Sequence, residues 1–195
     1  MEDQKTGGFL DQARNHVWAG AYARGDALDC FTYHGGFALQ MARRGARVTA
    51  YDLSAAAVAR ARENARRAGL AMAVEEANVF DVLPALFSRG LRYDTIVLDP
   101  PAFASTQKTV DAALRAYKEI NLRAMRLLRP NSILVSCSCS GRVTPTDFDA
   151  MLQAAARDVR RPIHFVERWA AGPDHPVLAG VPETDYLKCR VLMVV

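Results

Sequence analysis

From Asp26 onward, short apolar runs alternate with stretches whose apolar residues recur at helical spacing. Such runs are typical of buried strands, and such stretches of amphipathic helices. The pattern predicts strands near 27–31, 47–52, 71–75, 94–99, 133–135, 163–166 and 186–194, and helices near 36–44, 54–68, 81–89, 110–128 and 146–158. Because strands joined by helices run parallel and are covered on both faces, we expect an α/β fold with a doubly wound, mainly parallel, seven-stranded sheet.

The size of the chain fits one compact domain. Its 195 residues, half of them hydrophobic, can bury one sizeable core, so we expect a helical lead-in at 1–24 and a single domain over 25–195. The chain begins without a secretion-type apolar segment, and its four cysteines are too few for a disulfide scaffold, so we expect a cytoplasmic location. No apolar run approaches the ~18 residues that span a bilayer, so we expect no membrane partner. The net charge of +4 permits an anionic partner without establishing one.

Polar residues follow the first two predicted strands, at the edge where open parallel sheets bind ligands. Asp29 ends the first strand, the pair Gly35-Gly36 follows it, and Asp52 ends the second. The glycines fit a close approach of the backbone to a ligand, or an ordinary tight turn. A Gly-x-Gly-x-x-Gly dinucleotide fingerprint is absent. Asp29 could instead pair with the amino group of S-adenosylmethionine, and Asp52 could accept hydrogen bonds from both ribose hydroxyls.

Two further strand ends carry polar and aromatic residues. Asn78-Val79-Phe80 could offer an amide and an aromatic face to adenine, although Asn78 would also serve as a helix cap. Asp99-Pro100-Pro101-Ala102-Phe103 holds an acidic side chain and a stacking surface after the fourth strand, which suits a planar nitrogen-bearing substrate such as a nucleobase. The alternative for this segment is a simple strand-ending turn.

Two cysteines stand in the segment Ser136-Cys137-Ser138-Cys139-Ser140. Zinc ligands are normally two or more residues apart, and no second Cys/His cluster completes four ligands, so we expect no metal site. A disulfide between neighbours on one strand face would be strained. We expect Cys137 to be a core residue of the fifth strand. Cys139 lies past the strand end, where a thiol can reach a substrate.

Methylation of carbon 5 of a pyrimidine would use such a thiol. A thiolate that adds to carbon 6 pushes electron density onto carbon 5, which then attacks a sulfonium methyl group, and loss of the carbon-5 proton and of the thiol restores the ring. We expect Cys139 to be this nucleophile. Asp99, protonated or sharing a proton, would stabilise the adduct near ring nitrogen 3.

Five segments resemble, in order and over almost the whole chain, the bacterial 23S ribosomal RNA cytosine-5 methyltransferase I family: 5–12 (KTGGFLDQ), 29–37 (DCFTYHGGF), 99–103 (DPPAF), 117–121 (YKEIN) and 138–140 (SCS). The resemblance implies a Rossmann-like class I methyltransferase fold with an antiparallel last strand, S-adenosylmethionine as cofactor, 23S ribosomal RNA as substrate and Cys139 as nucleophile. The lead-in would fold over the cofactor. The expected cofactor site comprises Lys5, Thr6, Phe9, Asp29, Phe31, Tyr33, Gly35, Gly36, Asp52, Leu53, Ser54, Asn78, Val79, Phe80, Asp99 and Pro100, and the expected substrate side comprises Pro101, Phe103 and His175.

The lead-in departs from that family. The family usually has a second aromatic residue at the place of Gly8 and an arginine at the place of Ala13. Its members usually carry an amino-terminal RNA-binding domain, so we expect either an excised catalytic domain or another means of finding RNA. Two other functions stay open, namely a methyltransferase acting on nitrogen or on a small aromatic molecule, and a non-catalytic module that binds S-adenosylmethionine or RNA.

Overall fold

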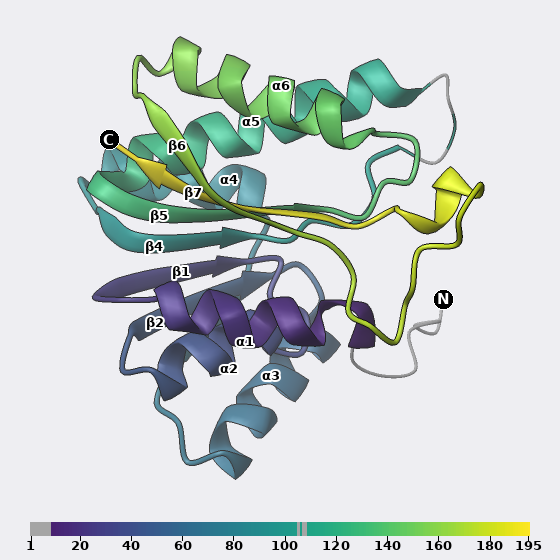
Figure 1. Cartoon of the computed structure of the whole chain (residues 1–195). Helices are drawn as coiled ribbons and strands as arrows, with labels where there is room; N and C mark the ends of the chain where they lie inside the picture. Colours follow the sequence, from purple (N-terminus) through teal and green to yellow (C-terminus); the bar gives the residue numbers. More distant parts are fainter. Residues whose placement is uncertain (1–8, 105, 107–108) are drawn as a thin grey trace.

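The structure is a computed structural model that describes residues 9–104, 106 and 109–195 (Figure 1). It forms three layers, with helices on both faces of one sheet. In chain order the elements are η1 (Leu10–Gln12), α1 (Ala13–Tyr22), β1 (Asp26–Cys30), α2 (Gly36–Arg43), β2 (Arg47–Asp52), α3 (Ala55–Arg67), β3 (Ala73–Glu76), α4 (Val79–Ser88), β4 (Tyr93–Leu98), α5 (Val110–Leu127), β5 (Leu128–Ser138), α6 (Pro145–Asp158), β6 (Ile163–Trp169), η3 (Pro182–Thr184) and β7 (Lys188–Val194).

The sheet has the strand order β3-β2-β1-β4-β5-β7-β6. Strand β1 pairs in parallel with β2 and β4, and β4 pairs in parallel with β5. The last strand, β7, lies between β5 and β6 and is antiparallel to both. The predicted doubly wound, mainly parallel sheet with an antiparallel last strand is confirmed. The chain order reverses between β1 and β4, the place where such sheets bind ligands.

The central strands are buried on both faces because helices cover both. Leu28, Ile96 and Leu134 point into the core formed with α4, α5 and α6. Their neighbours Ala27 and Val97 belong to the opposite core, under α1, α2 and α3. Each fully buried leucine or isoleucine contributes about 1.5–3 kcal/mol relative to an exposed one. Two cores thus hold the sheet rigid, and the loops at its edge carry the chemistry.

Strand β5 begins earlier than predicted. The sequence predicts a turn at 129–131 and a strand from 133. In the structure β5 starts at Leu128, directly after α5. Its pairing with β4 jumps from Leu128 to Ile133 while β4 advances only from Tyr93 to Thr95, so the turn-forming residues bulge out of the strand. Asn131 takes a left-handed backbone with φ 59° in this bulge.

The lead-in packs against the domain through α1. Helix α1 lies beside α2 (Figure 1), and a Cβ on Gly20 would come within 3.0 Å of the Gln40 carbonyl oxygen. Helix α1 also reaches β6, where the Trp18 and Trp169 rings lie 5.3 Å apart. Small residues therefore let the lead-in approach the sheet closely. None of the helices in the described part of the chain has the length and apolar character to cross a membrane.

Candidate active site

Asp29 is the most constrained polar residue at the carboxyl edge of the sheet. Its side chain is 1% exposed. Oδ2 accepts hydrogen bonds from Thr32 Oγ1 at 2.6 Å and from the Ala38 amide at 3.0 Å. Oδ1 has no hydrogen-bond partner among the described residues. Burial raises the pKa of Asp29 to about 7, and the nearby Asp99 and Asp52 carboxylates add to the increase. A buried carboxylate with a free oxygen fits a cationic hydrogen-bond donor.

The loop after β1 is strained. Phe31 and Tyr33 have φ values of 65° and 48°, a region that costs a non-glycine residue about 1–3 kcal/mol. Two hydrogen bonds hold it, from the Thr32 amide to the Tyr51 carbonyl and from the Tyr33 amide to Asp52 Oδ2 at 2.8 Å. Strain of this kind clusters at ligand sites, where the surrounding structure enforces it.

The glycine pair in this loop has two separate explanations. Gly35 caps α2 with φ 87°, a conformation that favours glycine. A Cβ on Gly36 would lie 2.4 Å from His16 Cε1, so the His16 ring fills that space. Packing of α1 therefore accounts for the second glycine without any ligand. Burial lowers the pKa of His16 to about 4, so its ring is neutral at pH 7.

Asp52 ends β2 beside the same loop. Its two carboxylate oxygens each accept one backbone amide, from Tyr33 at 2.8 Å and from Ser54 at 2.9 Å. Each oxygen keeps a further lone pair for a hydroxyl group. Leu53 is exposed, and Ser54 caps α3 through its hydroxyl. Ser54 thus serves twice, because its hydroxyl caps α3 and its amide holds the Asp52 carboxylate.

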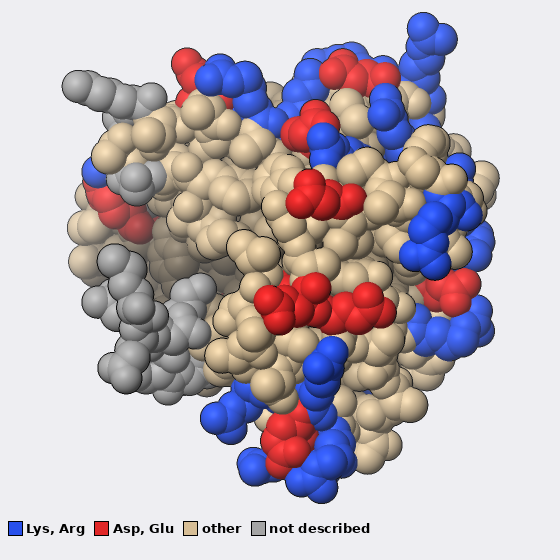
Figure 2. Space-filling model, turned by 180° about the vertical axis from the view of Figure 1, so that it is seen from behind, with Lys and Arg blue, Asp and Glu red and all other residues tan. Residues whose placement is uncertain are grey.

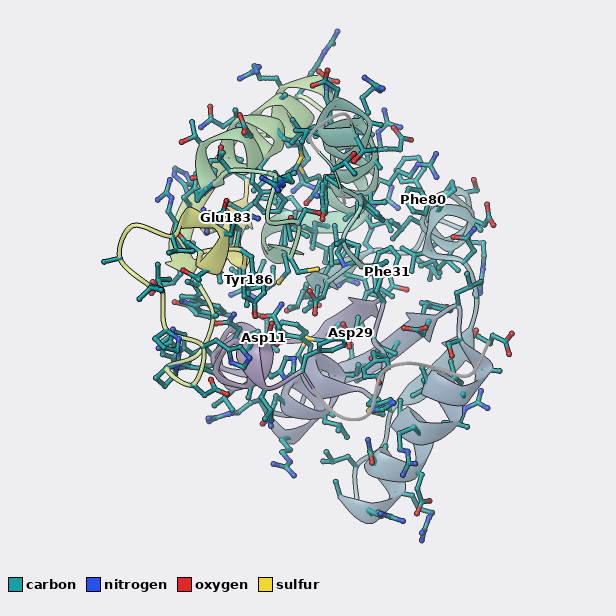
Figure 3. The ribbon with its side chains drawn as sticks, turned by 90° about the vertical axis from the view of Figure 1, so that its right-hand side faces the viewer. Asp11, Asp29, Phe31, Phe80, Glu183 and Tyr186 are labelled. Carbon is teal, nitrogen blue, oxygen red and sulfur yellow. The ribbon has the colours of Figure 1, made fainter. Side chains whose placement is uncertain are left out.

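Aromatic rings form a row at the other side of the edge. The Phe31, Phe80 and Phe103 rings follow one another at 6.5 Å and 6.1 Å. Phe103 also contacts the buried Tyr117 at 4.7 Å. In Figure 3, which views this edge, Phe31 and Phe80 lie together on one side and Asp29 lies next to them. The row provides flat apolar surface beside the acidic groups.

The three residues Asn78, Val79 and Phe80 have different places: one caps a helix, one is buried in the core and one lies at the edge of the sheet. Asn78 Oδ1 accepts a hydrogen bond from the Phe80 amide at 3.0 Å and caps α4, so its predicted capping role is confirmed. Val79 is buried in the core next to α5 rather than open to the edge. Asn78 and Phe80 are therefore the residues of this segment whose side chains a ligand could contact, whereas Val79 could take part only through its backbone.

The segment after β4 joins the lead-in to the sheet. Gln12 Nε2 donates a hydrogen bond to Asp99 Oδ1 at 3.0 Å. Pro100 is buried, whereas Pro101 is exposed and Phe103 is half-buried. Phe9, in the same lead-in, places its ring 5.1 Å from that of Tyr33. Two contacts thus bring the lead-in to the predicted site, while Lys5 and Thr6 lie outside the described residues.

The two cysteines at the end of β5 differ as predicted. Cys137 lies within β5 and is fully buried opposite Cys189 of β7. Cys139 lies directly after the strand and is half-buried. Burial raises the pKa of Cys139 to about 11, Asp99 raises it further, and Lys188 acts in the opposite direction. Within the described residues, no group of three or more His, Cys, Asp or Glu side chains could hold a metal ion.

Ser140 ties together the elements around Cys139. Its hydroxyl lies 2.9 Å from the Tyr117 hydroxyl and accepts a hydrogen bond from the Ala104 amide at 3.2 Å. Its carbonyl accepts a hydrogen bond from Lys188 Nζ at 2.7 Å. Helix α5, the loop after β4 and the start of β7 therefore meet at the residue next to Cys139.

The loop between β6 and β7 is fastened to the lead-in. Tyr186 donates a hydrogen bond to Asp11 Oδ2 at 2.7 Å, and the Gly172 amide donates to the Asp11 carbonyl at 2.9 Å. Figure 3 shows Asp11 and Tyr186 side by side at this edge. His175 lies in an exposed turn, its Nδ1 3.4 Å from Asp174 Oδ2. The position of His175 in this turn needs no ligand to explain it, and its predicted substrate contact stays a prediction.

The predicted residues thus converge on one edge of the sheet, and Asp29, Asp52 and Asp99 are close enough to influence one another electrostatically. Seen from behind, the molecule is hollowed at this edge, and elsewhere on that face basic side chains mix with acidic ones (Figure 2). Sequence reasoning missed Gln12, Ser140, Tyr186 and Lys188 as parts of the site. Only Lys188 left a signal, as one of two basic residues, with Arg190, in the mainly apolar last strand.

This strand order, with polar and aromatic strand ends at one edge, defines the class I methyltransferase fold. The chain belongs to the S-adenosylmethionine-dependent methyltransferase family, whose model matches residues 1–189. It is 40% identical to the protein named Ribosomal RNA large subunit methyltransferase I of Shewanella denitrificans, over all of this chain and 50% of that protein. The protein of the same name from Klebsiella pneumoniae is 39% identical, over 96% of this chain and 49% of the relative.

The chain therefore spans about half the length of the curated relatives it matches. Among solved structures, the methyltransferase SMU.776 complexed with SAH is similar with a TM-score of 0.83. That similarity covers 95% of this chain and 50% of the other at 23% identity, so it shows the fold alone.

Proposed function

We propose that the chain is an S-adenosylmethionine-dependent methyltransferase that forms 5-methylcytosine in 23S ribosomal RNA. The names of its relatives support a ribosomal RNA substrate. Cys139 supports the carbon-5 chemistry, because it is the only one of the four cysteines that is not fully buried. It lies at the same edge as Asp29 and Asp99, and this single observation carries the proposal. A cytoplasmic location follows from the substrate.

The residues of the edge fit the cofactor. Asp29 Oδ1, buried and without a partner among the described residues, would accept a hydrogen bond from its cationic amino group. Asp52 would bind the ribose hydroxyls with the lone pairs that its backbone contacts leave free. Phe31 and Phe80 would flank adenine, and Phe9 with Tyr33 would close the site from the lead-in. When bound, S-adenosylmethionine supplies an electrophilic methyl group.

The remaining members of the proposed cofactor site line the same loops. Gly35 and Gly36 form the turn into α2, Leu53 and Ser54 follow Asp52, and Pro100 follows Asp99. The proposed cofactor site also includes Lys5, Thr6, Asn78 and Val79. On the substrate side we place Pro101, Phe103 and His175.

Cys139 and Asp99 would act on the cytosine ring. The Cys139 thiolate adds to carbon 6, a bond forms between Sγ and carbon 6, and the electron pair of the carbon 5–carbon 6 double bond moves onto carbon 5. Asp99, held by Gln12, faces ring nitrogen 3 and stabilises the charge that develops there when its carboxyl group is protonated. Loss of the carbon-5 proton and cleavage of the bond to Sγ then restore the aromatic ring.

Replacement of the nucleophile tests this proposal. C139A is expected to bind S-adenosylmethionine as the wild type does and to transfer no methyl group to undermodified ribosomal RNA. The matched control C137A removes a fully buried thiol two residues away and should keep methyl transfer, although it loses stability. Mapping 5-methylcytosine in the RNA identifies the product.

Covalent trapping separates the alternatives. RNA containing 5-fluorocytosine should form a stable complex with the wild type and none with C139A, because fluorine at carbon 5 blocks release of the thiol. Methylation without trapping would favour an enzyme that acts on nitrogen or on small molecules. Cofactor binding without methylation of any RNA would indicate a non-catalytic module. Either result would overturn the proposal.

A further inference from the structure

Lys188 is a buried cation at the start of β7. Its side chain is 1% exposed, and its neighbours Leu187 and Cys189 are buried apolar residues. Removing an ammonium group from water is costly unless nearby groups compensate for the lost hydration. A lysine at this place therefore calls for a physical explanation.

Two neutral groups hold the Lys188 ammonium. Nζ donates hydrogen bonds to the Ser140 and Tyr186 carbonyl oxygens, each at 2.7 Å. An ammonium group has three N–H donors, so one donor remains. Among the residues that the structure describes, no carboxylate lies within ion-pair distance of Lys188. Its charge thus lacks an anionic counterpart at short range.

Cys139 lies between the two backbone positions that Lys188 contacts. Lys188 is paired across the sheet with Ser138, and its Nζ binds the carbonyl of Ser140. The two side chains also influence each other's ionisation. The pKa of Lys188 is lowered to about 8, mainly by burial and to a smaller extent by Arg190, whereas a Cys139 thiolate and the Asp185 carboxylate act in the opposite direction. By reciprocity the ammonium stabilises the thiolate, against the effects of burial and of Asp99.

We propose that Lys188 is the counter-ion of the Cys139 thiolate, held beside it by the carbonyls of Ser140 and Tyr186. The inference rests on the proposed role of Cys139 as nucleophile. Below about pH 8, where Lys188 is charged, an ionising Cys139 releases its proton to water and its thiolate lies beside the ammonium; above that pH the neutral amine no longer stabilises the thiolate. Lys188 is thus a positioning residue, because it acts on the substrate only through Cys139.

A purely structural role is the competing explanation, since Lys188 also joins the end of β5 to the start of β7. Two substitutions separate charge from hydrogen bonding. K188Q keeps two N–H donors and removes the charge, whereas K188R keeps N–H donors and also keeps the charge. K118Q removes another lysine charge, in a pair between Lys118 and Asp158 on α5 and α6, and is the control.

The readout is the rate at which iodoacetamide alkylates Cys139 between pH 6 and 10. The other three cysteines are fully buried, so the label reports Cys139 in the folded protein, and mass spectrometry confirms the site. An opposite charge at close range shifts a pKa by about 1–3 units, so K188Q should react at least about tenfold more slowly at pH 7, where Lys188 is charged. K188R and K118Q should react as the wild type does. A K188Q profile that coincides with the wild type, or a K188R profile as slow as that of K188Q, would overturn the proposal.

A second measurement avoids substitution of Lys188. The chain has only four lysines, so ¹³C labelling of lysine gives a simple spectrum in which Lys188 can be titrated. In C139D, which places a carboxylate where the thiolate would form, the Lys188 pKa should be higher than in the wild type, where Cys139 is still a thiol as Lys188 titrates. An unchanged pKa would contradict the proposal even where K188Q does not fold. Neither experiment needs RNA or cofactor, so failure of methyl transfer in C139A remains a separate test of the proposed function.

Discussion

Asp29 is expected to destabilise the fold in the absence of a cationic ligand. Its pKa is about 7 in the folded chain and 3.8 as the reference value. The native state binds this proton more tightly than the unfolded state does, so the free energy of unfolding falls as the pH rises from about 4 to about 7. The pKa difference of about 3 units lowers the free energy of unfolding by about 4 kcal/mol, and this loss is complete above pH 7.

Substitution of Asp29 by asparagine removes this cost and adds a smaller one. An amide nitrogen in the place of Oδ1 would be buried without an acceptor, at about 1–3 kcal/mol. D29N should therefore be about 1–3 kcal/mol more stable than the wild type at pH 8 and no more stable at pH 4. It should bind S-adenosylmethionine about 10- to 100-fold more weakly, because a charge-assisted hydrogen bond of about 1.5–3 kcal/mol is lost.

Urea unfolding at pH 4, 6 and 8, with calorimetric titration of the cofactor, measures both effects. D158N removes a half-exposed carboxylate paired with Lys118 and should change neither. A stability difference between D29N and the wild type that does not vary with pH would refute the electrostatic reasoning. Wild-type cofactor affinity in D29N would refute the assignment of Oδ1 to the amino group.

The remaining predictions concern the packing that supports the site. G36A should lower the free energy of unfolding by about 1–3 kcal/mol, because its Cβ would meet His16 at 2.4 Å. G141A, whose Cβ would have its nearest contact at 3.7 Å, should not. Equal midpoints of thermal unfolding in the two variants would contradict this. S140A should lower the free energy of unfolding by about 1–3 kcal/mol and slow the proposed methyl transfer, because two buried groups beside Cys139 lose a hydrogen-bond partner. T144A, which removes the α6 cap at about 1 kcal/mol, should leave transfer unchanged, and similar slowing in both variants would point to a general loss of stability.

The sequence predicted the elements that have strong local signals. Apolar runs located the strands, and the helical spacing of apolar residues near 54–68 located α3. The start of β5 was missed because residues such as Pro130 and Asn131 form turns and bulges equally well. Only pairing with β4, a contact distant in sequence, decides between the two.

The candidate site was predictable where a residue lies at a strand end, as Asp29 does near the end of β1, or follows a strand directly, as Asp99 and Cys139 do. Residues that reach the site from elsewhere were not. Tyr186 contributes through a hydrogen bond to Asp11, 175 positions away in sequence, and no local pattern predicts such a contact. The reason for Gly36 was equally hidden, because it depends on the packing of α1.

The position of β7 has a consequence for how the chain acquires its shape. β6 finds its hydrogen-bonded neighbour only in β7, which follows it in the chain and separates it from β5. During synthesis β6 therefore stays unpaired until β7 follows, whereas the part of the sheet from β1 to β5 can already assemble. Ser140 receives its lysine contact only when β7 inserts, so the segment around Cys139 is the last part of the proposed site to assemble.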